Sequence, residues 1–128
     1  MPELPVILVV EDEEPLQGFV HDALKDGGFD LVTTGSGEEA LTLFESGVVR
    51  YAALVTDVNL AGGMTGWILA RRVRETDSSF PVVYMTGAAA DQWGALGVPN
   101  SILLQKPFAP AQLVTAISQL LNAGSSGA

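Results

Sequence analysis

The chain has 128 residues, of which 48% are apolar, so it has the size of one ordinary domain with a real core and is not a disordered chain. Its 15 acidic and 6 basic residues leave a formal charge of −9, which argues against a general nucleic-acid binder, and the lack of cysteine excludes disulfide scaffolds and thiolate metal sites. No apolar stretch approaches the roughly 18 residues of a membrane span, and the N-terminal run is too short for a signal peptide, so we expect a cytoplasmic protein without membrane contact.

Apolar runs with the length of strands alternate along the chain with stretches that have apolar residues at helical spacing. The predicted strands are 4–10, 29–34, 52–57, 80–87 and 101–105. The predicted helices are 15–26, 36–46, a helix around 69–73, and 109–121. This alternation predicts an α/β fold in which helices cover both faces of a parallel sheet.

Local signals mark several boundaries of these elements. Pro15 suits a first helical turn, and Gly27 with Gly28 ends that helix. Ser36 and Glu39 have the spacing of a capping box at the start of the second helix. The glycines and the proline within 88–99 leave room for two or three helical turns at most, so this helix is expected to be short or irregular.

Polar side chains lie at the carboxyl ends of four of the five predicted strands. In a parallel sheet, ligands bind outside these ends. The first strand leads into Glu11 and Asp12, the third ends in Asp57, the fourth ends in Thr86, and Lys106 follows the fifth. We therefore expect three carboxylates, one hydroxyl and one ammonium to meet at one edge of the sheet.

This set of groups has a coherent chemistry. Carboxylates that face one another repel unless a cation lies among them, and hard oxygen ligands suit Mg²⁺. A lysine and a hydroxyl opposite the metal suit the oxygens of a phosphoryl group, and a carboxylate can accept that group as an aspartyl phosphate. No Gly-x-x-x-x-Gly-Lys loop is present, and no Gly-x-Gly-x-x-Gly follows the first strand, so nucleotide binding is not indicated.

Four motifs in this order resemble those of the response-regulator receiver domains of two-component signalling. They are "ILVVEDEEP", "LVTDVNLAGGMTGWILA", "VVYMTG" and "LLQKPF". Each motif is weak alone, but four in order at strand ends are specific. The resemblance covers residues 4 to about 122 and implies a doubly wound, flavodoxin-like sheet of five strands in the order 2-1-3-4-5. We expect a receiver domain at 1–122 and a flexible tail at 123–128.

The resemblance implies a role for each site residue. Asp57 would be the phosphoacceptor and would also contact Mg²⁺. Asp12 would be the direct metal ligand, and Glu11 would act more through water. The backbone carbonyl of Asn59 would complete the set of protein ligands. Thr86 would hydrogen-bond a phosphoryl oxygen. The remaining member, Lys106, would pair with the phosphoryl group, and a cis peptide would precede Pro107.

The resemblance also implies partners. A sensor histidine kinase or a histidine phosphotransfer protein would supply the phosphoryl group, and an unknown downstream protein would read the result. The domain would catalyse only its own phosphorylation and slow dephosphorylation, tuned in part by Asn59 and Ala88. We expect no direct contact with nucleic acid, no output domain, and a monomer or a weak dimer. Two roles fit: a stand-alone adaptor or phosphorelay intermediate, or a receiver cut from a longer kinase or regulator.

Three features depart from the family pattern. Leu103 stands where the family usually has Tyr or Phe, the spacing of 20 residues from Thr86 to Lys106 is short, and Glu11 replaces an aspartate. The first two put the usual output surface in doubt but do not touch the phosphorylation chemistry, and the third is a mild change that the family tolerates.

Other residues have plainer interpretations, and two other functions compete with this one. His21 is expected on the surface, Trp67 and Trp93 in packing or at a partner surface, and the arginines within 71–74 on the polar face of a helix.

A pseudo-receiver would bind partners without phosphorylation but predicts the loss of a site residue. An aspartate-nucleophile phosphatase of the haloacid-dehalogenase type predicts an aspartate at the position of Asn59.

Overall fold

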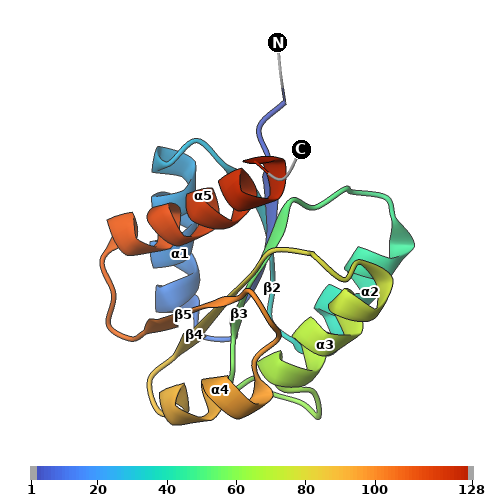
Figure 1. Ribbon diagram of the computed structural model, residues 1–128. Helices are drawn as coiled ribbons and strands as arrows, with labels where there is room; N and C mark the ends of the chain where they lie inside the picture. The colour runs from blue at the N-terminus through green and yellow to red at the C-terminus, as the bar shows by residue number, and fades with distance from the viewer. Residues whose placement is uncertain (1–2, 127–128) are drawn as a thin grey trace.

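The computed structural model describes residues 3–126, which form a parallel sheet between two layers of helices (Figure 1). The sheet has five strands in the order β2-β1-β3-β4-β5, and every neighbouring pair is parallel. The strands are β1 (Val6–Val10), β2 (Asp30–Thr34), β3 (Ala53–Asp57), β4 (Val82–Thr86) and β5 (Ile102–Gln105). This is the flavodoxin-like doubly wound fold, so the predicted fold class and strand order are confirmed.

The helices lie on both faces of the sheet: α1 and α5 on one side, α2 and α3 on the other (Figure 1). Their bounds are α1 (Glu14–Asp26), α2 (Gly37–Ser46), α3 (Gly66–Thr76), α4 (Trp93–Leu96) and α5 (Pro110–Ser126), with a 3₁₀ turn, η1 (Ala90–Gln92), before α4. None of the helices within residues 3–126 is long and apolar enough to cross a membrane.

The end of α5 differs from the prediction. The helix was expected to stop at 121 and a flexible tail to begin at 123, but the helical backbone continues to Ser126. No proline follows Leu121, and Leu and Ala are good helix formers, so nothing ends the helix at that point. The rest of the predicted tail, 127–128, lies outside the described residues.

The continuous apolar run of β1 is explained by burial on both faces. Ile7 and Val9 pack with α1 and α5, whereas Leu8 and Val10 pack with α2 and α3, and all four side chains are fully buried. Successive side chains of a strand point to opposite faces, so a strand between two helical layers needs apolar residues at every position.

The helix starts near the site are set by local capping and by one close backbone contact. The Ser36 hydroxyl accepts the Glu39 N–H at 3.1 Å, as the capping-box pattern predicts, and the Thr65 hydroxyl accepts the Ile68 N–H at 3.3 Å. At Gly66 an added Cβ would overlap the carbonyl oxygen of Asp57, so only glycine allows α3 to begin this close to the end of β3.

The segment between β4 and β5 is short, as predicted: one 3₁₀ turn and one turn of α4. Side chains of α3 and β4 hold it. Arg71 donates to the Leu96 carbonyl at 3.2 Å, and Arg74 donates to the Pro99 carbonyl at 2.7 Å. The α3 arginines were expected only as a polar helix face, and two of them instead satisfy backbone carbonyls of this segment or its flanks.

Aromatic residues complete this region. Trp67 is buried against Tyr84, with ring centroids 4.6 Å apart, and the Tyr84 hydroxyl accepts the Val98 N–H at 3.0 Å. Trp93 is 38% exposed and donates its indole N–H to Ser101 at 3.0 Å. Trp67 therefore packs in the core, whereas Trp93 is partly exposed and held by a hydrogen bond.

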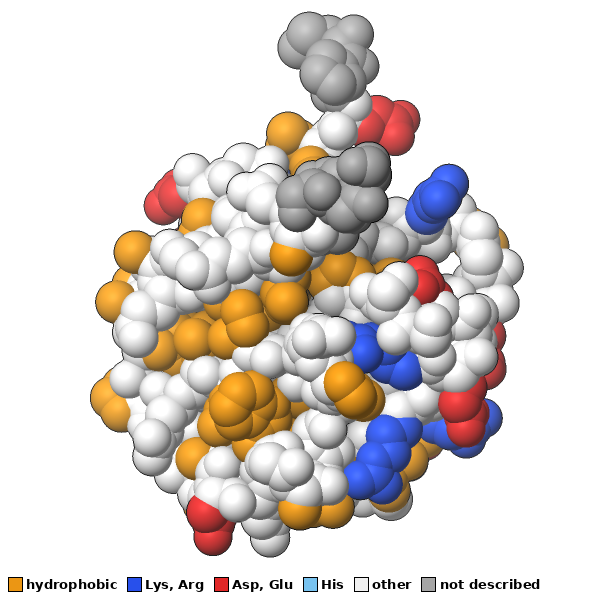
Figure 2. Space-filling view, viewed as in Figure 1, with side chains coloured by type: hydrophobic (Ala, Val, Ile, Leu, Met, Phe, Trp, Pro, Cys, Tyr) orange, Lys and Arg blue, Asp and Glu red, His pale blue; other side chains and the backbone are white. Residues whose placement is uncertain are grey.

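One face of the molecule is nearly free of charge. From Gln92 to Ser126, Lys106 is the only charged residue. Figure 2 shows apolar side chains gathered over the α4–α5 side of this view, while Lys and Arg side chains lie toward α3.

His21 lies exposed on α1 beside Asp22, as expected.

Candidate functional site

The carboxyl ends of the strands bring the predicted site residues to one edge of the sheet. Glu11 and Asp12 follow β1, and Asp57 ends β3, the neighbour of β1. One carboxylate oxygen from each of these three residues lies within 4.8 Å of the others. Thr86 ends β4 and Lys106 follows β5, so all five side chains come from the same edge.

Lys106 joins two of the carboxylates. Its Nζ lies 3.2 Å from Asp57 Oδ2 and 3.3 Å from Glu11 Oε1. The side chain of Lys106 is 23% exposed, whereas those of Asp57 and Glu11 are 8% and 0% exposed. One partly hydrated ammonium thus compensates two buried carboxylates, and the site keeps excess negative charge.

This charge pattern shifts two pKa values. Burial by itself lowers the pKa of Lys106, but the attraction of Asp57 and Glu11, with their hydrogen bonds, outweighs it and raises the pKa above its usual value. Burial also raises the pKa of Glu11; the charge of Asp57 adds to the rise, while the Glu13 N–H and Lys106 oppose it. A divalent cation among these oxygens would relieve the repulsion that contributes to the shift of Glu11.

The turn after β1 holds Glu11 from several sides. Its N–H donates to the Thr34 carbonyl at 3.0 Å, and its Oε2 accepts the Glu13 N–H at 3.0 Å. The Gln17 side chain donates to its carbonyl. Asp12, in contrast, is exposed, so its carboxylate faces solvent at the mouth of the site. Two neighbouring acidic residues therefore have different environments: Glu11 is inside and bonded, and Asp12 is outside.

Thr86 is fully buried and caps the segment that follows β4. Its Oγ1 accepts the N–H of Ala89 at 2.9 Å and the N–H of Ala88 at 3.3 Å. Because these bonds use the oxygen as an acceptor, the hydroxyl proton can still be donated to another group. The structure thus places Thr86 as a cap at the same edge of the sheet as the acidic residues.

Comparison with protein families agrees with this arrangement. The family model of the response regulator receiver domain matches residues 7–118. The chain belongs to the response regulator receiver domain family. Receiver domains are signalling domains of two-component systems and interact with histidine kinases or phosphotransfer proteins.

Known relatives support the assignment over most of this receiver domain. It is 31% identical over 118 residues to the probable transcriptional regulator ycf27 of Cyanophora paradoxa, covering 91% of this chain and 48% of that protein. It is also 31% identical over 118 residues to the uncharacterized transcriptional regulatory protein YkoG of Bacillus subtilis, covering 91% and 50%. The chain thus spans about half the length of the curated relatives it matches.

A solved structure gives the same picture for the domain alone. The response regulator receiver protein from Sinorhizobium medicae superposes with a TM-score of 0.91 at 43% identity, covering 94% of this chain and 97% of that one. The likeness extends over nearly the whole of both chains, so the fold and the family assignment agree.

The receiver domain also contains residues near its site that sequence reasoning missed. Gln17 on α1 supports the Glu11 carbonyl, and Glu38 on α2 accepts the N–H of Gly63, in the loop after β3 that also carries Asn59. Asn59 itself is exposed, and the cis peptide expected before Pro107 is present. No local pattern marks Glu38, because its partner lies 25 residues away in the sequence.

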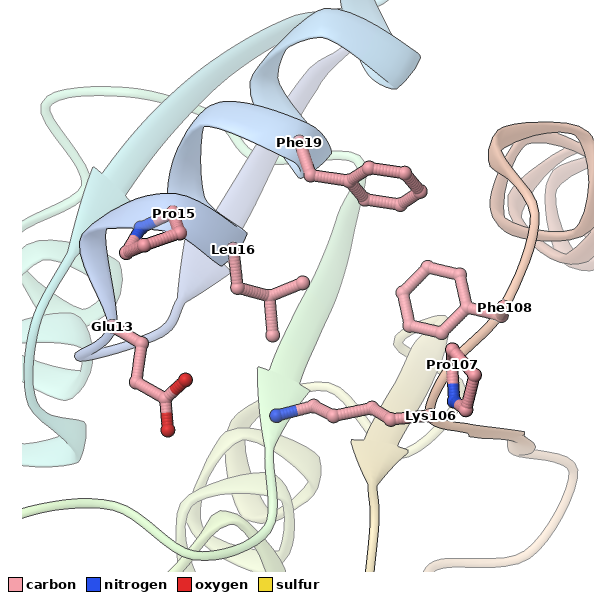
Figure 3. A pocket seen from close by; sticks show the side chains of 7 residues that line it. All are labelled: Glu13, Pro15, Leu16, Phe19, Lys106, Pro107 and Phe108. Carbon is pink, nitrogen blue, oxygen red and sulfur yellow. The ribbon is translucent and has the colours of Figure 1, made fainter.

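An apolar pocket of about 540 Å³ opens beside Lys106 (Figure 3). The rings of Phe19 and Phe108 meet edge to face in its wall, with centroids 5.7 Å apart. Residues from the start of α1 and from the segment after β5 line it: Glu13, Pro15, Leu16, Phe19, Lys106, Pro107 and Phe108. The site therefore has a charged centre with an apolar wall on the α1 side.

Proposed function

We propose that this receiver domain accepts a phosphoryl group on Asp57 from a phosphohistidine, with Mg²⁺, and passes the signal on through protein contacts. The observation that carries the proposal is the grouping of Asp57 with Glu11 and Asp12 within 4.8 Å, with Lys106 at 3.2 Å from the proposed acceptor. A buried carboxylate with a lysine beside it and acidic neighbours facing it is suited to a phosphoryl group and a hard cation.

The residues present fit Mg²⁺. All three acidic members of the group offer oxygen, and no nitrogen or sulfur ligand belongs to it. Asp12 and Asp57, with the backbone carbonyl of Asn59, would hold the ion directly, and Glu11, already bonded to Lys106, would support it more through water. When bound, Mg²⁺ supplies charge neutralisation on the oxygens of the transferred group.

Asp57 would act as the nucleophile. One of its carboxylate oxygens forms a bond to phosphorus while the phosphorus–nitrogen bond of the donor breaks. The electron pair of that bond stays on the imidazole nitrogen of the donor, which then takes a proton. Lys106 and the hydroxyl of Thr86 would donate to phosphoryl oxygens, so that Lys106 exchanges its contact with Asp57 for one with the phosphoryl group.

Hydrolysis of the aspartyl phosphate would end the signal at the same atoms. Water would attack phosphorus, release inorganic phosphate and restore the Asp57 carboxylate. Asn59 and Ala88, which follow Asp57 and Thr86 closely in the sequence and are both exposed, would set its rate in part. The domain would therefore catalyse only reactions of its own aspartate.

The apolar pocket beside Lys106 supports a protein as the phosphodonor. A sensor histidine kinase or a phosphotransfer protein could place apolar side chains against Phe19 and Phe108 while its histidine reaches Asp57. The downstream partner would also be a protein, because the charge of −9 disfavours direct contact with nucleic acid. The α4–α5 face, which carries little charge, is available to it. We propose that the domain works in the cytoplasm as a monomer or a weak dimer.

The test is intact mass after incubation with acetyl phosphate and Mg²⁺. The native protein should gain one phosphoryl group, and Asp57→Asn and the metal-free native protein should gain none. Asp22→Asn, which changes an exposed carboxylate on α1, is the matched control and should behave like the native protein. Absence of the adduct on the native protein, also with beryllofluoride as a probe of the same site, would refute the proposal in favour of a binding module without phosphorylation.

A further inference from the structure

The loop between β3 and α3, residues 58–65, packs Leu60 and Met64 against the core, but Gly62 and Gly63 between them have no side chains to hold that stretch in place. It leaves the sheet at the proposed acceptor, carries Asn59, and passes through Gly62 and Gly63 before the Thr65 cap of α3. Gly62 has a φ of 91°, in the region that favours glycine, and glycines leave a loop with high conformational freedom. Contacts from outside the loop must therefore define its position.

Glu38, in the first turn of α2, supplies one such contact. Its Oε2 accepts the Gly63 N–H at 3.1 Å. A Cβ added at Gly62 would lie 3.2 Å from Oε1, so the second oxygen faces the same loop. A carboxylate that accepts a backbone N–H makes a stronger hydrogen bond than a neutral acceptor does.

The residue before Glu38 supplies a second contact. Gly37 is buried, and a Cβ added there would lie 3.1 Å from Met64 Cγ, so the Met64 side chain rests directly on this turn of the helix. Two successive residues of α2 thus contact two successive residues of the loop.

The same turn also contacts the acidic end of β1. Glu11 donates its N–H to the Thr34 carbonyl at 3.0 Å, and the Thr34 hydroxyl donates to the Ser36 carbonyl at 3.3 Å. The segment 34–38 therefore touches both stretches of chain that carry the acidic group, the turn after β1 and the loop after β3.

We propose that Glu38 is a positioning residue of the metal site: by holding Gly63, it fixes the β3–α3 loop at the distance from the acidic pair at which both stretches can share one Mg²⁺. This inference rests on the proposed function. The contact is exposed, so it adds little to folding stability, and its effect falls on the freedom of a glycine-containing loop. A loop that is already in place loses less entropy when the ion binds, which strengthens binding.

The test compares Glu38→Ala, Glu38→Gln and Glu39→Ala by calorimetric titration with Mg²⁺. Glu38→Ala should weaken Mg²⁺ binding about fivefold, the loss expected for one hydrogen bond. Glu38→Gln keeps an oxygen that accepts the Gly63 N–H, but as a neutral acceptor, so it should weaken Mg²⁺ binding less than Glu38→Ala does. Glu39→Ala removes the same charge from the same turn. Among the described residues, the Glu39 side chain has no hydrogen bond to the loop, so this variant should bind Mg²⁺ normally.

A second measurement needs no metal. Amide hydrogen exchange at Gly63 in the metal-free protein should be faster in Glu38→Ala than in the native protein and Glu39→Ala, while the urea midpoint stays the same. Equal weakening of Mg²⁺ binding in all three variants would show a long-range effect of charge and overturn the positioning role. Native binding by Glu38→Ala would overturn it too while leaving the proposed function intact, whereas a native protein that neither binds Mg²⁺ nor is phosphorylated would overturn both.

Discussion

Replacing Lys106 with methionine removes the only cation among the described residues that contacts the buried carboxylates of the site. The ammonium lies 3.2 Å from Asp57 and 3.3 Å from Glu11, and methionine keeps most of the side-chain volume without the charge. The two carboxylates then face each other and Asp12 without compensation, so the metal-free protein should be less stable.

The magnitude follows from burial. Removing one partner of a fully buried ion pair costs about 3–5 kcal/mol. Lys106 is 23% exposed and water reaches this edge of the sheet, so we expect a smaller loss, ~2 kcal/mol in the free energy of unfolding at pH 7. In a domain of this size, that loss lowers Tm by roughly 6 to 8 °C.

Mg²⁺ should reduce this difference. The ion compensates the same carboxylates, and in Lys106→Met it no longer meets the repulsion of a neighbouring ammonium. Urea unfolding followed by circular dichroism, with EDTA and with saturating Mg²⁺, should therefore show a larger Mg²⁺-dependent gain for Lys106→Met than for the native protein.

Lys25→Met is the matched control, because Lys25 makes a shorter contact, 2.8 Å to Asp30, but both side chains are about half exposed. It should change stability little, since exposed ion pairs contribute little. The reasoning is refuted if Lys106→Met unfolds at the native urea concentration in EDTA, or if Mg²⁺ stabilises it less than it stabilises the native protein.

Two further predictions concern the surroundings of the site. Gly66→Ala places a methyl group against the carbonyl oxygen of Asp57 and should lower the free energy of unfolding, measured by thermal unfolding, by more than about 2 kcal/mol. Gly18→Ala is the control, because open space surrounds Gly18, and should leave the free energy of unfolding nearly unchanged. Tyr84→Phe leaves the buried Val98 N–H without its acceptor and should cost about 1–2 kcal/mol at pH 7. Burial raises the pKa of Tyr84, so the stability that its protonated hydroxyl contributes is complete below pH 10 and is lost as pH rises above that value. The free energy of unfolding should therefore fall less steeply between pH 9 and 11 for Tyr84→Phe than for the native protein. An equal slope would contradict a raised pKa for Tyr84.

Much of the fold was predictable because its signals are local. The unbroken apolar run of β1 indicates burial on both faces, and Ser36 marks the start of α2 through a bond to a residue three positions away. The glycines and Pro99 predict the short helical segment between β4 and β5. Such patterns depend on neighbours within about one helical turn or one strand, and the sequence displays those neighbours directly.

The end of α5 shows where local signals fall short. A stretch of small residues after Leu121 indicated a tail, yet the helical backbone continues to Ser126. Small residues without a proline permit either state, so composition alone does not place the end of the helix.

The sequence by itself therefore determined the αβ alternation and the polar residues after four strands, which is enough to identify the edge where a site forms. Only the tertiary structure decided how those residues share their charges: Lys106 bonds to Glu11 across 95 positions, and Glu38 holds Gly63 across 25. The physical reason is that strand order and register bring distant segments together, and the side chains then choose partners by distance and burial, which no periodicity encodes.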